Sequence, residues 1–120
     1  MSSGGHRHHA IDYIEFAVRD LAAAKRFYAD AFGWEFTDYG PAYSGIKGAD
    51  GEVGGMYPSE AVPAGGGLLV ILYSKDLEQS LTAVKAAGGT ISRSPFAFPG
   101  GRRFHFLDPS GHELAVWSDV

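Results

Sequence analysis

A histidine and a glutamate stand side by side near the end of the chain, in the stretch DPSGHELAVW (108–117). His112 and Glu113 are residue types that bind divalent metals or transfer protons. The stretch begins with a tight turn and continues as an apolar run, which predicts a strand after the turn. Because neighbouring side chains of a strand point to opposite faces, the two residues cannot chelate one metal ion together. We therefore expect His112 to be a solvent-facing residue beside the turn.

Two helices of similar pattern occupy matching places in the chain. Asp20 precedes the first predicted helix and Asp76 precedes the second, each as an N-cap. Gly33 and Gly89 follow the two helices as stop signals. One strand-like segment precedes each helix, and three more follow it, separated by turns that contain glycine. The sequence therefore predicts the order βαβββ twice.

With 120 residues, the chain is long enough for one compact core and too short for two full-sized domains. We expect a single domain at residues 10–119, because neither module would bury its sheet face alone. The organisation that follows is a flexible tail at 1–9, modules at 10–58 and 67–119, and a linker rich in Pro and Gly at 59–66.

Composition narrows the class of partner. The net charge is −4, and cationic residues cluster only near the N-terminus and at Arg102–Arg103, so we expect neither nucleic acid nor an anionic membrane as a partner. With no cysteine, there is no disulfide and no thiolate metal site, which fits a reducing cytoplasm. No apolar run is long enough to span a membrane, and no signal peptide is recognisable. We expect a cytoplasmic protein.

Two motifs carry a family resemblance: DLAAAKRFYADAFGW (20–34) and FLDPSGHELAVW (106–117). The chain resembles the vicinal oxygen chelate superfamily (glyoxalase I, bleomycin- and fosfomycin-resistance proteins, extradiol dioxygenases) from about Ala10 to Ser118. The resemblance implies an α+β fold in which two βαβββ modules form a curved mixed sheet around a cavity, with helices on the outer face. It also implies a homodimer and, in the family's enzymes, a divalent metal held by four side chains.

The four metal-ligand positions of the family fall on residues of unusual type. They are the first-strand and fourth-strand positions of each module, here Tyr13, Gly55, Leu69 and Ala115. Leu, Gly and Ala have no donor, and a neutral Tyr is a poor ligand. We therefore expect no metal and no other cofactor. A relocated metal site made from Glu15, His105 and Glu113 is the alternative, and it requires three donors to converge without the family's frame.

The alternation of strand side chains predicts which residues line the cavity. Arg103 and His105 join this set through the resemblance to glyoxalase-like proteins. The predicted ligand-binding residues are Tyr13, Glu15, Leu69, Ile71, Tyr73, Arg103, His105, Glu113 and Trp117. This set is mostly apolar and aromatic with a few directing groups, as is typical of small-molecule pockets. Each aromatic member has an alternative role as a core residue.

The polar members each have two interpretations. Glu15 either forms a structural bridge with Arg103 or His105, or faces the ligand as an acid or base. His105 is either a hydrogen-bonded cavity residue or a proton carrier. Arg103 is a candidate clamp for a carboxylate or phosphonate, whereas Arg102 should point outward. Glu15 and His105 are thus the candidate catalytic residues.

The leading hypothesis is metal-independent binding of an apolar or aromatic small molecule, as in bleomycin-resistance-like sequestration of an antibiotic or metabolite. The rival is a glyoxalase-like lyase or isomerase, or a dioxygenase-type enzyme, with atypical metal ligands or a Glu15/His105 acid–base pair. A third possibility is a regulator or subunit whose cavity is vestigial. The residues themselves favour a binding protein over an enzyme.

Overall fold

The computed structural model describes residues 6–61, 67–109 and 111–120. The chain divides into two compact units, and each is described by itself. Unit 1 contains the described residues of Tyr13–Leu68, and unit 2 contains His6–Asp12 and Leu69–Val120. The first two residues of the first strand therefore belong to unit 2, although the sequence places them in the first module.

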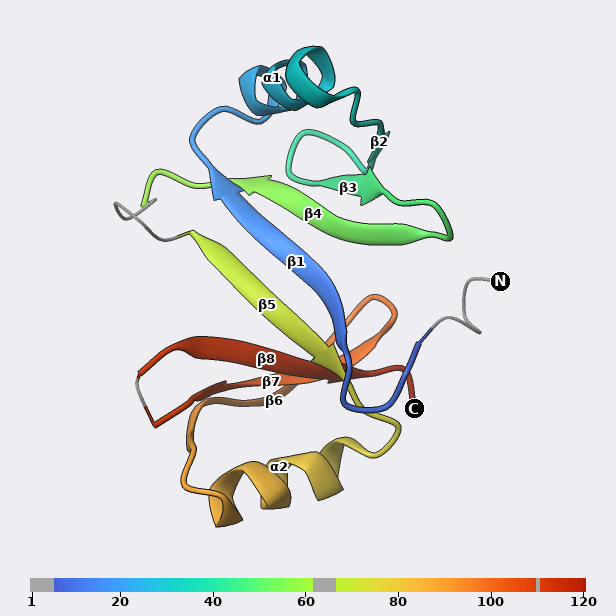
Figure 1. Cartoon of the computed structure of the whole chain (residues 1–120). Coiled ribbons are helices and arrows are strands. Elements are labelled where there is room, and N and C mark those ends of the chain that lie inside the picture. Colours follow the sequence, from blue (N-terminus) through green and yellow to red (C-terminus); the bar gives the residue numbers. More distant parts are fainter. Residues whose placement is uncertain (1–5, 62–66, 110) are drawn as a thin grey trace. The chain divides into compact units, whose positions relative to one another are not determined.

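Unit 1 has the order strand, helix, three strands (Figure 1). Its strands lie in the order β2-β3-β4-β1, with β1 parallel to β4 and the other pairs antiparallel. Its elements are β1 (Ile11–Val18), α1 (Leu21–Phe32), β2 (Phe36–Asp38), β3 (Ser44–Lys47) and β4 (Glu52–Pro58).

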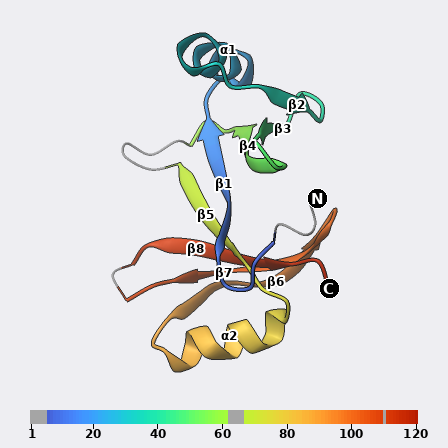
Figure 2. The ribbon, with the colours of Figure 1, turned by 45° about the vertical axis from the view of Figure 1, so that its right-hand side comes forward.

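Unit 2 repeats this pattern. Its strands lie in the order β5-β8-β7-β6, with β5 parallel to β8 and the other pairs antiparallel. Its elements are β5 (Leu68–Tyr73), α2 (Leu77–Ala86), β6 (Thr90–Phe98), β7 (Gly101–Leu107) and β8 (Glu113–Ser118). Figure 2 shows α2 along one side of β6, β7 and β8. The predicted α+β class, the two βαβββ modules and the mixed pairing of strands are confirmed.

The register of the parallel pairs gives the repeat a structural basis. In unit 1, Glu15 of β1 lies opposite Gly55 of β4. In unit 2, Ile71 of β5 lies opposite Ala115 of β8. These are the same positions of the two modules, because each strand pair is related by the same crossover through a helix. Gly55 and Ala115 are thus equivalent residues, as the sequence predicts.

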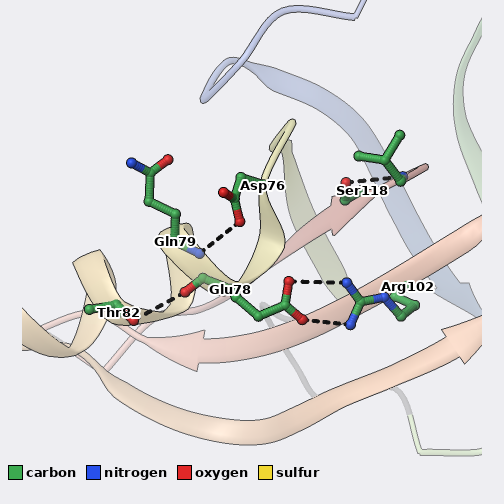
Figure 3. A network of polar contacts seen from close by, with 7 residues as sticks. Asp76, Glu78, Gln79, Thr82, Arg102 and Ser118 are labelled. Carbon is green, nitrogen blue, oxygen red and sulfur yellow. Dashed lines mark hydrogen bonds and ion pairs between the residues drawn. The ribbon is translucent and has the colours of Figure 1, made fainter.

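Both helices begin at the predicted caps. The Asp20 carboxylate accepts from the N–H of Ala23 at 3.0 Å, and the Asp76 carboxylate accepts from the N–H of Gln79 at 3.1 Å. Helix α1 ends at Gly33, whose φ of 73° is left-handed and suits a residue without Cβ. Figure 3 shows the cap of α2 together with the ion pair between Glu78 and Arg102. The two contacts of that pair measure 2.7 and 3.2 Å, so Arg102 points toward the helix.

We expect Asp76→Ala to lower the free energy of unfolding by about 1 kcal/mol, because the first turn of α2 would lose a hydrogen-bond acceptor for its free N–H groups. Urea denaturation of the wild type and the variant measures this difference. Asp76→Asn retains an acceptor oxygen and should keep most of the stability. Equal losses in the two variants would show that the cap is not the cause.

The core of unit 2 lies between α2 and the sheet. Leu77 of α2 packs with Phe104 of β7 and Val116 of β8, which are 0% and 3% exposed. Because strand side chains alternate, Arg103, His105, Ala115 and Trp117 lie on the opposite face. Helix α2 thus leaves a sheet face that carries the predicted site residues of this unit.

In unit 1, Phe16 of β1 faces α1. Its ring centroid lies 6.0 Å from that of Tyr28 of α1 and 6.2 Å from that of Trp34. Tyr13 and Glu15 therefore lie on the other face, as the alternation predicts. Neither helix of the described chain has the length and apolar character needed to cross a membrane.

The N-terminal segment is in contact with unit 2 from His6 onward. The N–H of His9 donates to the carbonyl of Tyr73 at 2.6 Å, and the N–H of Lys75 donates to Nδ1 of His8 at 3.0 Å. The flexible tail at residues 1–9 stays a prediction, and residues 1–5 lie outside the described part. His6, His8 and His9 make the contacts described here because histidine rings supply both apolar faces and hydrogen-bonding nitrogens.

Candidate functional site

The face of the unit 1 sheet that points away from α1 carries a chain of hydrogen bonds between tyrosines and glutamates. Tyr13 and Tyr39 donate to the two carboxylate oxygens of Glu52 at 2.6 and 2.7 Å. Tyr43 donates to Glu15 at 3.0 Å, and its hydroxyl oxygen lies 2.9 Å from that of Tyr13. The predicted residues Tyr13 and Glu15 are therefore brought together through Tyr43. Pairing of Glu15 with Arg103 or His105 stays a prediction.

This network makes Tyr13 a poor metal ligand. Burial and the hydrogen bond to Glu52 raise its pKa well above the ordinary value of 10.0. Burial likewise raises the pKa of Tyr43, the second tyrosine of the network. A phenol that remains protonated and donates to a carboxylate has little affinity for a divalent ion.

Two glycines of unit 1 are needed because other side chains occupy the space above them. A Cβ at Gly55 would overlap the Tyr43 hydroxyl and ring, and a Cβ at Gly45 would overlap the Glu52 carboxylate. Tyr43 and Glu52 thus cover the positions from which side chains of β3 and β4 would otherwise project. The sequence prediction missed both residues, although a Gly-Gly pair inside a strand signals close approach of another group.

The face of the unit 2 sheet that points away from α2 carries two rows of side chains. The strand register determines which residues share a row. The first row runs through Tyr73 of β5, Trp117 of β8, Arg103 of β7 and Phe96 of β6. The second row contains Ile71, Ala115, His105 and Arg93 in the same order of strands. Six of the nine predicted ligand-binding residues therefore lie on this face: Ile71, Tyr73, Arg103, His105, Glu113 and Trp117. Leu69 has the same strand parity as Ile71.

Cations and aromatic rings alternate at the β6 end of this face. The guanidinium carbon of Arg93 lies 4.0 Å from the centre of the Phe96 ring, and that of Arg103 lies 5.5 Å away. Arg103 also lies 5.7 Å from the centre of the Phe98 ring. A guanidinium group within about 6 Å of a ring centre is attracted by the electrons of the ring face. Arg93, Phe96 and Phe98 were not among the predicted site residues.

His105 and Glu113 form a pair on the same face. Nδ1 of His105 lies 3.2 Å from Oε2 of Glu113, which also accepts from the Ser92 hydroxyl at 3.2 Å. Because a carboxylate only accepts, Nδ1 carries the proton and Nε2 keeps a lone pair. His105 is 6% exposed, and its Nε2 has no hydrogen-bond partner within the described ranges. This is the arrangement of an oriented base or of an acceptor that awaits a ligand.

His112 lies apart from this pair. Its N–H donates to Oδ1 of Asp108 at 2.9 Å, its Nδ1 lies 3.1 Å from Oδ2 of Asp108, and its side chain is 76% exposed. Asp108 therefore holds His112 at the turn between β7 and β8. The prediction that His112 and Glu113 do not act together agrees with this placement.

The pKa of His105 predicts a pH dependence of stability. Burial lowers this pKa below the ordinary value of 6.5, the contact with Glu113 opposes the shift, and the charges of Arg103 and Arg93 add to it. The unfolded chain therefore binds a proton at higher pH than the folded chain does, so stability should fall as the pH drops below about 6.5. Urea denaturation between pH 7.5 and 5 measures this slope.

Two variants check the source of that slope. His105→Gln removes the titrating group and should flatten the dependence. Glu113→Gln removes the carboxylate that supports the charged form, which lowers the His105 pKa further and should steepen it. Parallel slopes in the wild type and His105→Gln would rule out His105 as the origin.

A second cluster on unit 2 joins the N-terminal segment to Trp117. The indole N–H of Trp117 donates to Oδ2 of Asp12 at 3.0 Å, and Nδ1 of His6 lies 2.9 Å from Oδ1 of the same carboxylate. The His6 ring stacks on Tyr73 with centroids 5.0 Å apart and meets Trp117 edge-on at 5.1 Å. Tyr73 donates to Asp119 at 2.5 Å, which raises the pKa of Tyr73 to about 12. Sequence reasoning missed His6, Asp12 and Asp119 because their partners are distant along the chain.

Unit 1 also has an apolar pocket of about 330 Å³ on the face that carries α1. The pocket lies on the side of β1 opposite Tyr13 and Glu15. It is lined by Ile14, Phe16, Trp34, Ile46, Lys47 and Val53. None of these is a predicted ligand-binding residue.

Comparison with protein-family models identifies the family of this chain. The model of the Glyoxalase/Bleomycin resistance protein/Dioxygenase superfamily matches residues 10–116. The chain belongs to this superfamily. A search of curated proteins gives no match. The resemblance predicted from the two sequence motifs is confirmed.

Solved structures of this superfamily share the fold. The Mn(II)-bound glyoxalase from Novosphingobium aromaticivorans is 26% identical, with a TM-score of 0.70 over 95% of this chain and 40% of that chain. A superfamily member from Vibrio splendidus 12B01 is 15% identical, with a TM-score of 0.70 over 89% of this chain and 97% of that chain. A variant of the methylmalonyl-CoA epimerase from Streptomyces coelicolor is 15% identical, with a TM-score of 0.69 over 95% of this chain and 99% of that chain.

The metal ion implied by the superfamily does not fit the residues of this chain. At the four ligand positions, the Tyr13 hydroxyl donates to Glu52, the Tyr43 hydroxyl fills the space above Gly55, and Leu69 and Ala115 offer no donor. Nor do the described residues contain a group of three or more histidine or acidic side chains placed to hold a metal ion. The relocated site of Glu15, His105 and Glu113 stays a prediction, because Glu15 belongs to unit 1 and the other two residues belong to unit 2.

Proposed function

We propose that this protein binds an apolar or aromatic small molecule without a metal ion and sequesters it, as an antibiotic- or metabolite-binding member of the superfamily. The observation that carries the proposal is the row of Tyr73, Trp117, Arg103 and Phe96 beside Ala115. A methyl group stands where the superfamily's enzymes present a metal ligand, and aromatic rings stand next to it. Stacking on one ring contributes about 0.5–1.5 kcal/mol beyond burial, so several rings on one face add to the affinity for a planar ligand.

The polar residues of this face offer groups that would orient a bound ligand. Arg103 offers a planar guanidinium to a ligand oxygen, and Nε2 of His105 offers an acceptor to a ligand hydroxyl or N–H. A mostly apolar surface with a few oriented polar groups is typical of small-molecule sites. The ligand-binding role of Tyr13, Glu15 and Leu69 and the homodimer remain parts of this proposal.

Fluorescence of Trp117 tests the proposal in a Trp34→Phe background, which leaves one tryptophan. We expect naphthol, a planar aromatic probe, to quench the fluorescence saturably, with the same affinity in the presence and absence of EDTA. Trp34 lies in unit 1, so its removal leaves the face of unit 2 intact. Absence of saturable quenching by naphthol, or quenching that requires an added divalent ion, would contradict the proposal.

A second candidate function is proton transfer by His105. It is favoured by the contact between Nδ1 and Glu113, which leaves the Nε2 lone pair available for a proton, and by the lowered pKa that keeps the ring neutral. Exchange of the methyl protons of acetophenone in D2O, followed by NMR, tests for such a base. Exchange above the buffer rate that is lost in His105→Gln would favour this function, and exchange at the buffer rate would exclude it for this probe.

A further inference from the structure

The His6 ring lies where a flat ligand would bind to unit 2. It stacks on Tyr73 at an interplanar angle of 18° and meets the edge of Trp117 at 86°. These are the two favourable arrangements of aromatic rings, made at the same time by one imidazole. Tyr73 and Trp117 are also the aromatic residues on which the proposed function rests. The N-terminal segment therefore covers the surface that a ligand would need.

The chemistry of this contact is specific. The Asp12 side chain is 14% exposed. Its two carboxylate oxygens accept from Trp117 Nε1 and His6 Nδ1. Without His6, one oxygen of a largely buried carboxylate would lose its donor, which is costly unless another N–H replaces it. An occupant that displaces His6 therefore binds more tightly if it brings an N–H group to the same place.

The charges around the ring favour a cation. Asp12 accepts from His6 directly, and Asp119 accepts from the Tyr73 hydroxyl, so two acidic groups adjoin the Tyr73 ring. The nearest cation on the same row, Arg103, has its guanidinium over the rings of Phe96 and Phe98. A positively charged flat group in the place of His6 would meet the acidic groups and the face of the electron-rich Tyr73 ring together.

The attachment of His6 is local. Its side chain is 29% exposed, and it belongs to no helix or strand. Its side-chain contacts in the described ranges are those to Asp12, Tyr73 and Trp117. A residue held by a few side-chain contacts moves away at low free energy, so a ligand can compete with His6 for its site.

We infer that Asp12, Tyr73 and Trp117 form a subsite for a planar cation with N–H donors, such as an amidinium or imidazolium group, and that His6 is an internal occupant which such a ligand displaces. This inference rests on the proposed function, because it names the ligand chemistry and the regulation of the same face. It predicts that the protein is partly self-inhibited.

Three probes of equal ring size test the ligand chemistry: benzamidine is a cation with N–H donors, benzamide is a neutral donor, and benzoate is an anion without donors. The readout is the NMR shift of the Trp117 indole N–H, which reports directly on the contact with Asp12. Affinities should fall in the order benzamidine, benzamide, benzoate. Benzoate binding as tightly as benzamidine would overturn the inference.

His6→Ala tests the self-inhibition. Removing the His6 side chain should tighten benzamidine binding by about tenfold. The state with an open subsite, which binds benzamidine, then no longer competes with the state in which His6 covers the subsite. Asp12→Asn in the His6→Ala background should abolish the preference for benzamidine over benzamide, and Tyr73→Phe should retain it, since the ring stays. Unchanged benzamidine affinity in His6→Ala would also overturn the inference.

Naphthol separates this inference from the proposed function. If naphthol binds the wild type or His6→Ala while benzamidine shows no preference, the proposed function holds and the subsite does not exist. If neither naphthol nor benzamidine binds either protein, both proposals fail.

Discussion

Gly55→Glu is expected to lower the free energy of unfolding by at least about 3 kcal/mol, because the new side chain must displace Tyr43 and its charge would lie near two other carboxylates. Gly55 is buried, and Tyr43 is anchored by its contacts with Tyr13 and Glu15, so the ring cannot move without losing them. Restoring an acidic residue at the superfamily's ligand position should therefore disrupt unit 1 and create no metal site. Thermal or urea unfolding measures the loss.

Two further alanine variants separate the effect of steric overlap from the effect of charge at position 55. Gly55→Ala adds only a Cβ, and we expect a loss of about 1–3 kcal/mol. Combining it with Tyr43→Ala removes the obstruction, so the two effects should be less than additive in a double-mutant cycle. A Gly55→Glu protein that keeps wild-type stability and binds Mn²⁺ would contradict the structural account of unit 1.

Trp117→Ala is expected to weaken naphthol binding by about 30-fold or more, equivalent to about 2 kcal/mol. Trp117 contacts Tyr73 at a centroid distance of 5.3 Å and Phe98 at 6.1 Å, so its loss removes the centre of the aromatic face. Isothermal titration calorimetry measures the affinity without relying on tryptophan fluorescence.

Trp34→Ala is the matched control, since Trp34 is the other tryptophan of the chain and lies in unit 1. It should leave naphthol affinity within about twofold of the wild type, because every residue of the proposed binding face in unit 2 is kept. Trp117→Phe keeps an aromatic ring and should retain most of the affinity. Equal affinities in Trp117→Ala and the wild type would place the binding site elsewhere.

Most of the fold follows from local sequence signals. Asp20 and Asp76 cap helices that begin at the next residue. The strand-like runs IDYIEFAV (11–18), EVGGMYP (52–58) and TISRSPFAF (90–98) coincide with β1, β4 and β6. These elements are specified by caps, glycine stops and alternation, which depend on residues near in the chain. The strands β2 and β3 are shorter than the runs WEFTDYG (34–40) and YSGIKG (43–48) that predict them. The sequence pattern marks an extended stretch, but it does not show which of its residues pair with a neighbouring strand.

The candidate site was only partly predictable. Alternation placed Tyr13 with Glu15, and His105 with Trp117, on the helix-free faces of their sheets, because it depends on strand geometry alone. The residues Tyr43, Glu52 and His6 were not predicted, since each reaches the site from a segment whose approach is fixed by tertiary packing. Arg93 and Phe96 were missed because β6 has two register irregularities that alternation does not anticipate.

The central claim, metal-independent binding, is tested most directly by calorimetric titration of naphthol into EDTA-treated protein, with metal content measured on the same sample. We expect saturable binding in metal-depleted protein, with an affinity that added Mn²⁺, Zn²⁺ or Ni²⁺ does not change. Stoichiometric metal in the purified protein, together with binding that disappears on chelation and returns with the ion, would contradict the claim.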